Sequence, residues 1–231
     1  MLKLYIGNKN YSSWSMRPWV LLRHFGIPFE EVMLRFDSFD AGSNFKRAVG
    51  QLSPVGKVPV LVHDALVVWD TLAIAEYAAE YAAARFPEHA LWPRDPAQRA
   101  RARSLCAEMH AGFSALRGAC PMNIEASLPE VGRRVLAEQP GVAADLARIV
   151  AMWQDALTAS GGPFLFGGFS IADAYYAPVA ARLRTYALPV PAELATYTRR
   201  LWASPGVADW VRDALAEQEF LAFEEPYRSA P

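Results

Sequence analysis

The order of strand-like and helix-like segments in residues 1–85 most constrains the fold of this chain. Four segments have the apolar pattern of strands: 2–6, 29–34, 58–62 and 65–69. Two segments have the pattern of helices: 14–25, between the first two strands, and 70–85, after the last. A strand–helix–strand unit gives a parallel pair, and the tight His63-Asp64 turn gives an antiparallel pair. We therefore expect a mixed four-stranded sheet with helices packed on it.

The character of the chain changes beyond residue 85. Residues 86–96 contain three prolines and are predicted to be a linker. Helices are then predicted over 97–118, 128–160, 171–186, 191–203 and 205–219, with a break in the second near Gln139-Pro140. This pattern predicts an α/β domain over 1–85, a linker over 86–96 and an all-α domain over 97–231.

The composition excludes several classes of protein. The chain is 53% hydrophobic and 20% charged, which fits a soluble globular protein, and its net charge of −1 gives no support for nucleic-acid or membrane binding. No apolar run approaches the length of about 18 residues that a membrane-spanning helix needs. No signal-peptide core follows Lys3, so a cytoplasmic protein is predicted. Cys106 and Cys120 lack metal-binding or redox spacing and are expected to be free thiols, and no metal site is predicted.

A serine-rich turn, Tyr11-Ser12-Ser13-Trp14-Ser15, links the first strand to the first helix. The first backbone N–H groups of a helix lack internal partners, and the helix dipole is positive there. A hydroxyl held in this position can donate to an anion on a ligand. The alternative is that these serines only cap the helix.

Two further segments are expected near this turn. In Lys57-Val58-Pro59, a cis bond before the proline would turn the backbone of Val58 outward, where it can pair with an extended, peptide-like ligand. At Asp70-Thr71, a carboxylate, a hydroxyl and free N–H groups at a helix start can hold an ammonium and a carboxylate. Each segment alone also fits an ordinary strand start or helix cap. Together they indicate a site for a short, charged peptide whose reactive group lies near Ser12.

These segments resemble the glutathione transferase superfamily, and the resemblance covers nearly the whole chain. Residues 53–61 resemble its central signature, with the cis-proline at Pro59, and residues 69–77 resemble its second, with Asp-Thr for the usual Glu-Ser. Residues 169–174 resemble its capping box and staple. The resemblance implies a thioredoxin-like domain followed by an all-helical domain, with glutathione as cosubstrate. The glutathione-binding residues that it implies are Lys57, Val58, Pro59, Asp70 and Thr71.

Within the superfamily, residues 11–17 resemble the serine-type zeta class, whose Ser-Ser-Cys-Ser motif is followed by an arginine. This implies that Ser12 stabilises the glutathione thiolate with help from Arg17, while Ser13 and Tyr11 are alternatives to Ser12. Arg17 also fits a solvated or core-bridging role. Trp14 stands where the motif has its cysteine, which departs from the zeta-type isomerase. The residues expected to bind the second substrate are Trp14, Met109, His110 and Phe113, although the last three also fit plain packing roles.

The resemblance implies a homodimeric glutathione S-transferase that activates the glutathione thiol and conjugates it to a small hydrophobic electrophile, as in detoxification. Two alternatives stay open. One is a glutathione-dependent isomerase of the maleylacetoacetate type, or a dehalogenase. The other is a non-catalytic glutathione- or ligand-binding protein of the same fold. Neither nucleic acid nor a membrane is expected as a partner.

Overall fold

The first part of the chain forms a mixed four-stranded sheet. The structure is a computed structural model that describes residues 1–230. Its strands are β1 (Leu2–Ile6), β2 (Phe29–Met33), β3 (Val60–His63) and β4 (Leu66–Trp69), in the order β2-β1-β3-β4. β1 pairs in parallel with β2 and antiparallel with β3, and β3 and β4 form an antiparallel hairpin. The predicted mixed sheet is confirmed, with β3 beginning just after Pro59, which has no N–H to donate to the ladder.

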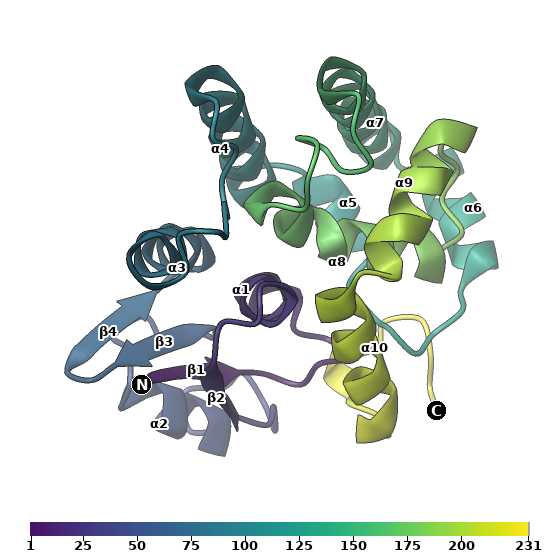
Figure 1. The fold of residues 1–231 in the computed structure, drawn as a ribbon. Helices are drawn as coiled ribbons and strands as arrows, with labels where there is room; N and C mark the ends of the chain where they lie inside the picture. The colour runs from purple at the N-terminus through teal and green to yellow at the C-terminus, as the bar shows by residue number, and fades with distance from the viewer. Residues whose placement is uncertain (231) are drawn as a thin grey trace.

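Side-chain alternation along β1 and β3 places apolar residues on both faces of the sheet. Three helices cover these faces: α1 (Ser13–His24), α2 (Asn44–Gly50) and α3 (Thr71–Arg85). α1 and α3 lie on one side and α2 on the other (Figure 1). Leu4 and Leu61 are buried in the larger core, whereas Val60 packs with Phe45 and Val49 of α2 in a smaller one. The sheet is therefore covered on both faces.

In the second part of the chain, as far as residue 230, the regular structure is helical apart from two short isolated β-bridges. Its helices are α4 (Pro96–Ala111), α5 (Ser114–Ala119), α6 (Pro129–Glu138), α7 (Pro140–Ser160), α8 (Ile171–Thr185), α9 (Ala192–Trp202) and α10 (Pro205–Glu217), and a 3₁₀ turn follows at Ala222–Glu224. The predicted order of an α/β part followed by an all-α part is thus confirmed. Within residues 1–230, no helix is both long and apolar enough to cross a membrane.

One predicted helix, 97–118, was wrong, because the chain breaks into α4 and α5. Gly112 is extended there and Phe113 has a left-handed φ of 57°. A Cβ at Gly112 would lie 2.8 Å from the Glu108 carbonyl oxygen, so the break requires glycine. The expected break near Gln139-Pro140 is confirmed, since Pro140 begins α7 at the position where its missing N–H costs nothing.

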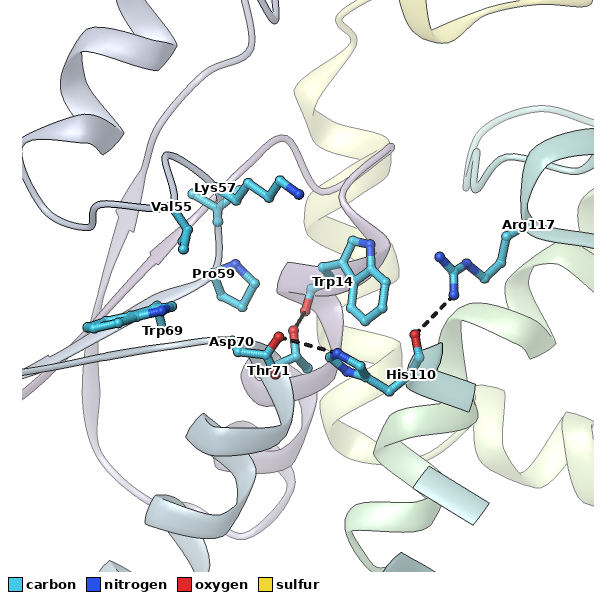
Figure 2. Close-up of a pocket in the computed structure, with 10 residues that line it drawn as sticks. Trp14, Val55, Lys57, Pro59, Trp69, Asp70, Thr71, His110 and Arg117 are labelled. Carbon is cyan, nitrogen blue, oxygen red and sulfur yellow. Dashed lines mark hydrogen bonds and ion pairs between the residues drawn. The ribbon is translucent and has the colours of Figure 1, made fainter. Parts of the chain in front are cut away.

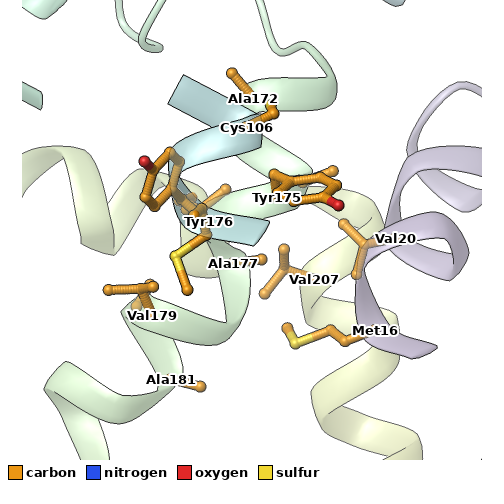
Figure 3. Packing of buried hydrophobic residues seen from close by; sticks show 14 of the residues in the cluster. Met16, Val20, Cys106, Ala172, Tyr175, Tyr176, Ala177, Val179, Ala181 and Val207 are labelled. Atoms are coloured by element: carbon orange, nitrogen blue, oxygen red, sulfur yellow. The ribbon is translucent and has the colours of Figure 1, made fainter. Parts of the chain in front are cut away.

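Helix α8 forms the centre of the helical part. Every residue of α8 except Arg184 is buried, and the helix packs against α1, α4 and α9. Tyr175 of α8 lies beside Val20 of α1 (Figure 3), and both belong to one core cluster with Met16 of α1 and Val207 of α10. One continuous core therefore joins the helical part to the sheet through α1.

The predicted capping box at the start of α8 is confirmed. The Asp173 carboxylate accepts the Ser170 N–H at 2.9 Å, and its other oxygen accepts the Leu165 N–H and the Tyr197 hydroxyl, both at 3.1 Å. All of these groups surround a fully buried carboxylate. Asp173 is therefore a structural residue that ties α8 to α9 and to the preceding loop.

The C-terminal segment returns to the first part of the chain. The Tyr11 hydroxyl donates to the Glu225 carboxylate at 2.8 Å, and the Asn8 amide donates to Glu219 at 2.6 Å. Phe223 packs edge-to-face on Phe39, with ring centroids 5.3 Å apart. This segment therefore borders the region around the serine-rich turn.

Replacing Asp173 by alanine is expected to lower the free energy of unfolding by about 2–4 kcal/mol, because several buried donors lose their acceptor. Tyr197→Phe, which removes one of these hydrogen bonds, is expected to cost about 1 kcal/mol. Urea unfolding of both variants measures the difference. Equal losses in the two variants would contradict a central role for the carboxylate.

Candidate functional site

The serine-rich turn holds two hydroxyl groups against the start of α1. Ser12 occupies the N-cap position, yet its side chain makes no capping hydrogen bond within the described chain. Its hydroxyl lies 2.7 Å from the Ser15 hydroxyl, which also accepts the Gly7 N–H at 3.1 Å. The capping alternative is therefore wrong for the Ser12 side chain, and Ser15 is the residue that positions it.

The paired hydroxyls leave one proton available. A hydroxyl has one proton to donate and two lone pairs to accept, and either member of such a pair can be the donor. In residues 1–230, the Ser15 hydroxyl has no hydrogen-bond partner other than Ser12 and the Gly7 N–H. If Ser15 donates to Ser12, the Ser12 proton is free for an anion in a cavity that Ser12 lines. Ser13, which is half-buried, lines this cavity too.

Tyr11 takes part in a different contact. Its hydroxyl donates to Glu225 at 2.8 Å and lies 3.1 Å from the Glu219 carbonyl oxygen. Burial raises the pKa of Tyr11 to about 12. This hydroxyl therefore anchors the C-terminal segment and is less available to a ligand than those of Ser12 and Ser13.

A cavity of about 460 Å³, called the first cavity below, lies where α1, α3 and α4 meet the loop before β3 (Figure 2). It contains all five residues that the resemblance assigns to glutathione binding: Lys57, Val58, Pro59, Asp70 and Thr71. The remaining lining residues are Trp14, Val55, Trp69, His110 and Arg117. The Val58–Pro59 bond is cis, as the resemblance implies. The separate sequence segments thus come together around one space.

Polar contacts cross the first cavity from the sheet domain to the helical part. One Asp70 oxygen accepts the Leu72 N–H at 2.9 Å and so caps α3, while the other lies 3.3 Å from His110 Nε2. The other ring nitrogen of His110 shares a hydrogen bond of 3.0 Å with the Tyr175 hydroxyl. The Thr71 hydroxyl donates to the Trp14 carbonyl oxygen at 3.3 Å. Asp70 is exposed, so its carboxylate stays accessible to a cationic group of a ligand.

A second cavity, of about 440 Å³, adjoins the first. Its lining residues come from both parts of the chain: Tyr11, Ser12, Ser13, Trp14, Phe36, Phe39, Phe45, Lys46, Lys57, Val58, Arg117, Pro121, Met122, Arg182 and Glu224. Four of them, Trp14, Lys57, Val58 and Arg117, also line the first cavity. The two cavities therefore form one cleft, with Ser12 and Ser13 beside their junction.

Arg17 lies behind the cleft wall and lines neither cavity. Its guanidinium is stacked between Trp14 and Tyr175, with its central carbon 4.1 and 4.7 Å from the two ring centroids, and its Nε donates to the Tyr175 carbonyl oxygen at 3.0 Å. Burial lowers the pKa of Arg17 to about 10. The expectation that Arg17 acts directly on a bound thiol does not fit this position, because Trp14 separates it from the cleft.

Two of the expected substrate-binding residues also lie in the core. Met109 is fully buried and Phe113 nearly so, and neither lines the first or the second cavity. They belong to the core cluster around α8. The sequence left open whether these two residues bind a substrate or pack in the core. Their positions in the structure favour packing. Trp14 and His110, in contrast, both line the cleft.

Several residues of the cleft, or in contact with it, were not singled out by the sequence, among them Tyr175, Arg182 and Glu224. Tyr175 and Arg182 lie on α8, a helix with no local signal of a ligand. Glu224 lies in the C-terminal turn, which reaches the cleft through the fold. α8 carries two arginines, Arg182 and Arg184, and the sequence alone does not show that Arg182 is the buried one.

Ser15→Ala is expected to lower the free energy of unfolding by about 1–2 kcal/mol, because the buried Gly7 N–H loses its acceptor. The matched control, Ser13→Ala, removes a half-buried hydroxyl and is expected to change it by less than about 0.5 kcal/mol. Chemical denaturation of both variants measures these changes. Equal stability of the two variants would show that Ser15 does not hold the turn.

Comparison with known proteins agrees with the geometry. The family model described as "Glutathione S-transferase, N-terminal domain" matches residues 11–80, and its C-terminal counterpart matches residues 96–213. The crystal structure of a glutathione transferase homolog from Burkholderia, with bound glutathione, is 25% identical to this chain. The two superpose with a TM-score of 0.70 over 93% of this chain and 98% of that one.

Curated relatives match over shorter stretches. A probable maleylacetoacetate isomerase of Caenorhabditis elegans is 32% identical over 113 residues, which is 49% of this chain and 48% of that protein. Glutathione S-transferase 1 of Dianthus caryophyllus is 35% identical over 99 residues, 43% of this chain and 41% of that protein. The matched stretches thus span less than half of either relative. The C-terminal family model covers more than half of the chain, and the N-terminal model adds most of the sheet domain. The chain therefore belongs to the glutathione S-transferase family.

Proposed function

We propose that this chain binds glutathione in the first cavity and conjugates its thiol to a small electrophile held in the second. One observation carries the proposal: the two cavities meet at Trp14, Lys57, Val58 and Arg117, with Ser12 and Ser13 beside the junction. In this assignment residues 1–85 form the glutathione-binding domain, residues 86–96 the linker, and residues 97–231 the domain that completes the electrophile site.

The first cavity offers groups that complement a short charged peptide. Glutathione carries an ammonium, two carboxylates, peptide groups and a thiol. The exposed Asp70 carboxylate suits the ammonium, and the exposed Lys57 ammonium suits a carboxylate. The backbone of Val58 can pair with a peptide group, as an edge strand does. These contacts would leave the thiol directed toward the junction of the cavities.

The reaction needs the thiolate form of glutathione. A thiol of this type has a pKa near about 8.5, so a small fraction is ionised at neutral pH. A hydrogen bond from the Ser12 hydroxyl and the positive end of α1 both favour the thiolate. The thiol proton passes to water, the sulfur forms a bond to the electrophilic carbon, and the leaving group departs with its bonding electrons. Arg117, which lines both cavities, adds positive charge beside the sulfur.

Two alternative functions of the same cleft can be tested beside conjugation. In a glutathione-dependent isomerase the sulfur adds and leaves again, and the C. elegans relative, a probable maleylacetoacetate isomerase, favours this reading for part of the chain. A non-catalytic binding protein would hold glutathione without turnover. A product that contains glutathione distinguishes conjugation from both. The homodimer and the cytoplasmic location stay predictions.

Ser12→Ala is expected to lower kcat/KM for glutathione and chlorodinitrobenzene by at least about tenfold, because the thiolate loses a hydrogen bond worth about 1.5–3 kcal/mol. Ser13→Ala is the matched control, one position away on the same turn, and is expected to retain most activity. Initial rates across pH, together with the pKa of the bound thiol from ultraviolet absorbance, separate activation from binding. Full activity of Ser12→Ala with loss in Ser13→Ala would transfer the role to Ser13.

Asp70→Asn is expected to weaken glutathione binding by about tenfold or more, because it removes the negative charge that faces the ligand ammonium. Asparagine still caps a helix, so the free energy of unfolding should stay nearly unchanged. Asp70→Ala should weaken binding to a similar degree and also lower stability by about 0.5–2 kcal/mol, since the Leu72 N–H loses its cap. Calorimetric titration and urea unfolding measure the two effects. Unchanged affinity in Asp70→Asn would contradict the assignment.

A further inference from the structure

The second cavity has aromatic walls. Five aromatic side chains line it: Tyr11, Trp14, Phe36, Phe39 and Phe45. The ring of Phe36 lies 4.8 Å from that of Phe45 and 5.2 Å from that of Phe39, both edge-to-face. A flat ring of a ligand can pack against such walls with good surface contact.

The same cavity carries an excess of basic side chains. Its lining contains four, namely Lys46, Lys57, Arg117 and Arg182, against a single carboxyl, that of Glu224. Three of them donate to neutral protein groups: Lys46 to the Gly56 carbonyl oxygen, Arg117 to that of His110, and Arg182 to that of Cys120. Within residues 1–230, none of the four lies within ion-pair distance of a carboxylate. The positive charge of the cavity is thus not neutralised by ion pairs.

Arg182 is the most informative of these residues. It is 4% exposed, and buried guanidinium groups are normally paired with a carboxylate, because removing an unpaired charge from water is costly. Two hydrogen bonds, from Nε to the Cys120 carbonyl oxygen at 2.8 Å and from Nη1 to that of Pro178 at 3.1 Å, fix its position. Burial and the nearby charges of Arg17 and Arg117 lower the pKa of Arg182 to about 9. An anion in the cavity would offset this repulsion.

Glu224 does not supply that anion in full. Burial and the neighbouring charge of Glu225 raise the pKa of Glu224 to about 7, so a large share of this carboxyl is neutral at physiological pH. The other carboxylate of the turn, Glu225, is paired with Arg228 and accepts the Tyr11 hydroxyl. Neither carboxyl of the turn forms an ion pair with Arg117 or Arg182, so an anionic ligand would be the first negatively charged partner of these arginines within residues 1–230.

We propose that the second cavity takes an aromatic electrophile that carries a carboxylate or a comparable anionic group, with the ring among the phenylalanines and the anion toward Arg117 and Arg182. This inference rests on the proposed function and names the substrate class of that site. The reaction is substitution on the ring: the glutathione sulfur bonds to the ring carbon and chloride or another leaving group departs with the bonding pair. The carboxylate takes no part in bond changes and serves for recognition.

The test compares chloronitrobenzoate with the matching chloronitrobenzamide, which share ring and leaving group and differ in charge. Each kcat/KM is divided by the rate constant of the uncatalysed reaction with glutathione, because the amide activates the ring more strongly. We expect a normalised preference for the carboxylate of about tenfold. Arg117→Gln should reduce this preference at least about fivefold. Arg117 also lines the first cavity, so its substitution can lower activity toward both substrates. The test therefore uses the ratio of the two normalised kcat/KM values, because a general loss of activity leaves this ratio unchanged.

Arg134→Gln is the control, since Arg134 is exposed on α6 and lines neither cavity, and it should keep the wild-type ratio. Arg182→Gln should act like Arg117→Gln, and the Arg117 variant decides the question if Arg182→Gln does not fold. Equal normalised rates in the wild type, or an unchanged ratio in Arg117→Gln, would overturn the inference.

Failure of the proposed function gives a different result, because then neither these substrates nor chlorodinitrobenzene is turned over. In that case the affinities of the protein for benzoate and for benzamide are measured by calorimetry instead of the rates of turnover. Preferential binding of benzoate that Arg117→Gln abolishes would support the anion site, and equal binding of both compounds would overturn it.

Discussion

Helix α1 is packed between the sheet and the helical part, and the position of the whole cleft depends on this packing. Its Met16 and Val20 lie against α8 and α10 (Figure 3). Gly206, at the start of α10, approaches α1 so closely that a Cβ there would lie 2.4 Å from the Val20 carbonyl oxygen. Because α1 begins at the serine-rich turn, burial of the helix on both sides fixes Ser12 relative to both cavities.

The helical part also shapes the wall of the cleft through Tyr175. This residue accepts the Arg17 Nε–H with its carbonyl oxygen, stacks its ring on the same guanidinium, and shares its hydroxyl with His110. Through Arg17 it supports Trp14, and through His110 it reaches Asp70. Tyr175 therefore supports both the junction of the cavities, through Arg17, and the expected ammonium site, through His110. A substitution at Tyr175 should therefore alter the shape of the cleft although Tyr175 lines neither cavity.

Most of the fold and the convergence of segments at the first cavity could be predicted because their signals are local. The strand order follows from short alternating segments, and Val58-Pro59 and Asp70-Thr71 are motifs of two or three residues. The lining of the second cavity could not be predicted in the same way. Spacing places Met109 and Phe113 on a helix face, but the fold decides that α8 covers that face. For the same reason, the sequence left open whether Arg17 reaches a ligand or bridges the core, since its burial depends on Tyr175. Arg182 and Glu224 reach the cleft from distant segments.

Trp14 stands where the zeta-type motif has a cysteine, and its side chain contacts two of the arginines at the cleft. Its indole lies between two guanidinium groups, with the central carbons of Arg17 and Arg117 at 4.1 and 5.1 Å from the ring. The faces of an aromatic ring are electron-rich and attract cations, so the indole separates like charges that would otherwise repel. A cysteine at this position would be too small to fill that space. The tryptophan thus removes a thiol from the turn and at the same time allows arginines to gather around the cleft. On this reasoning, the absence of the motif cysteine and the arginine-rich wall of the proposed anion site are two consequences of one residue.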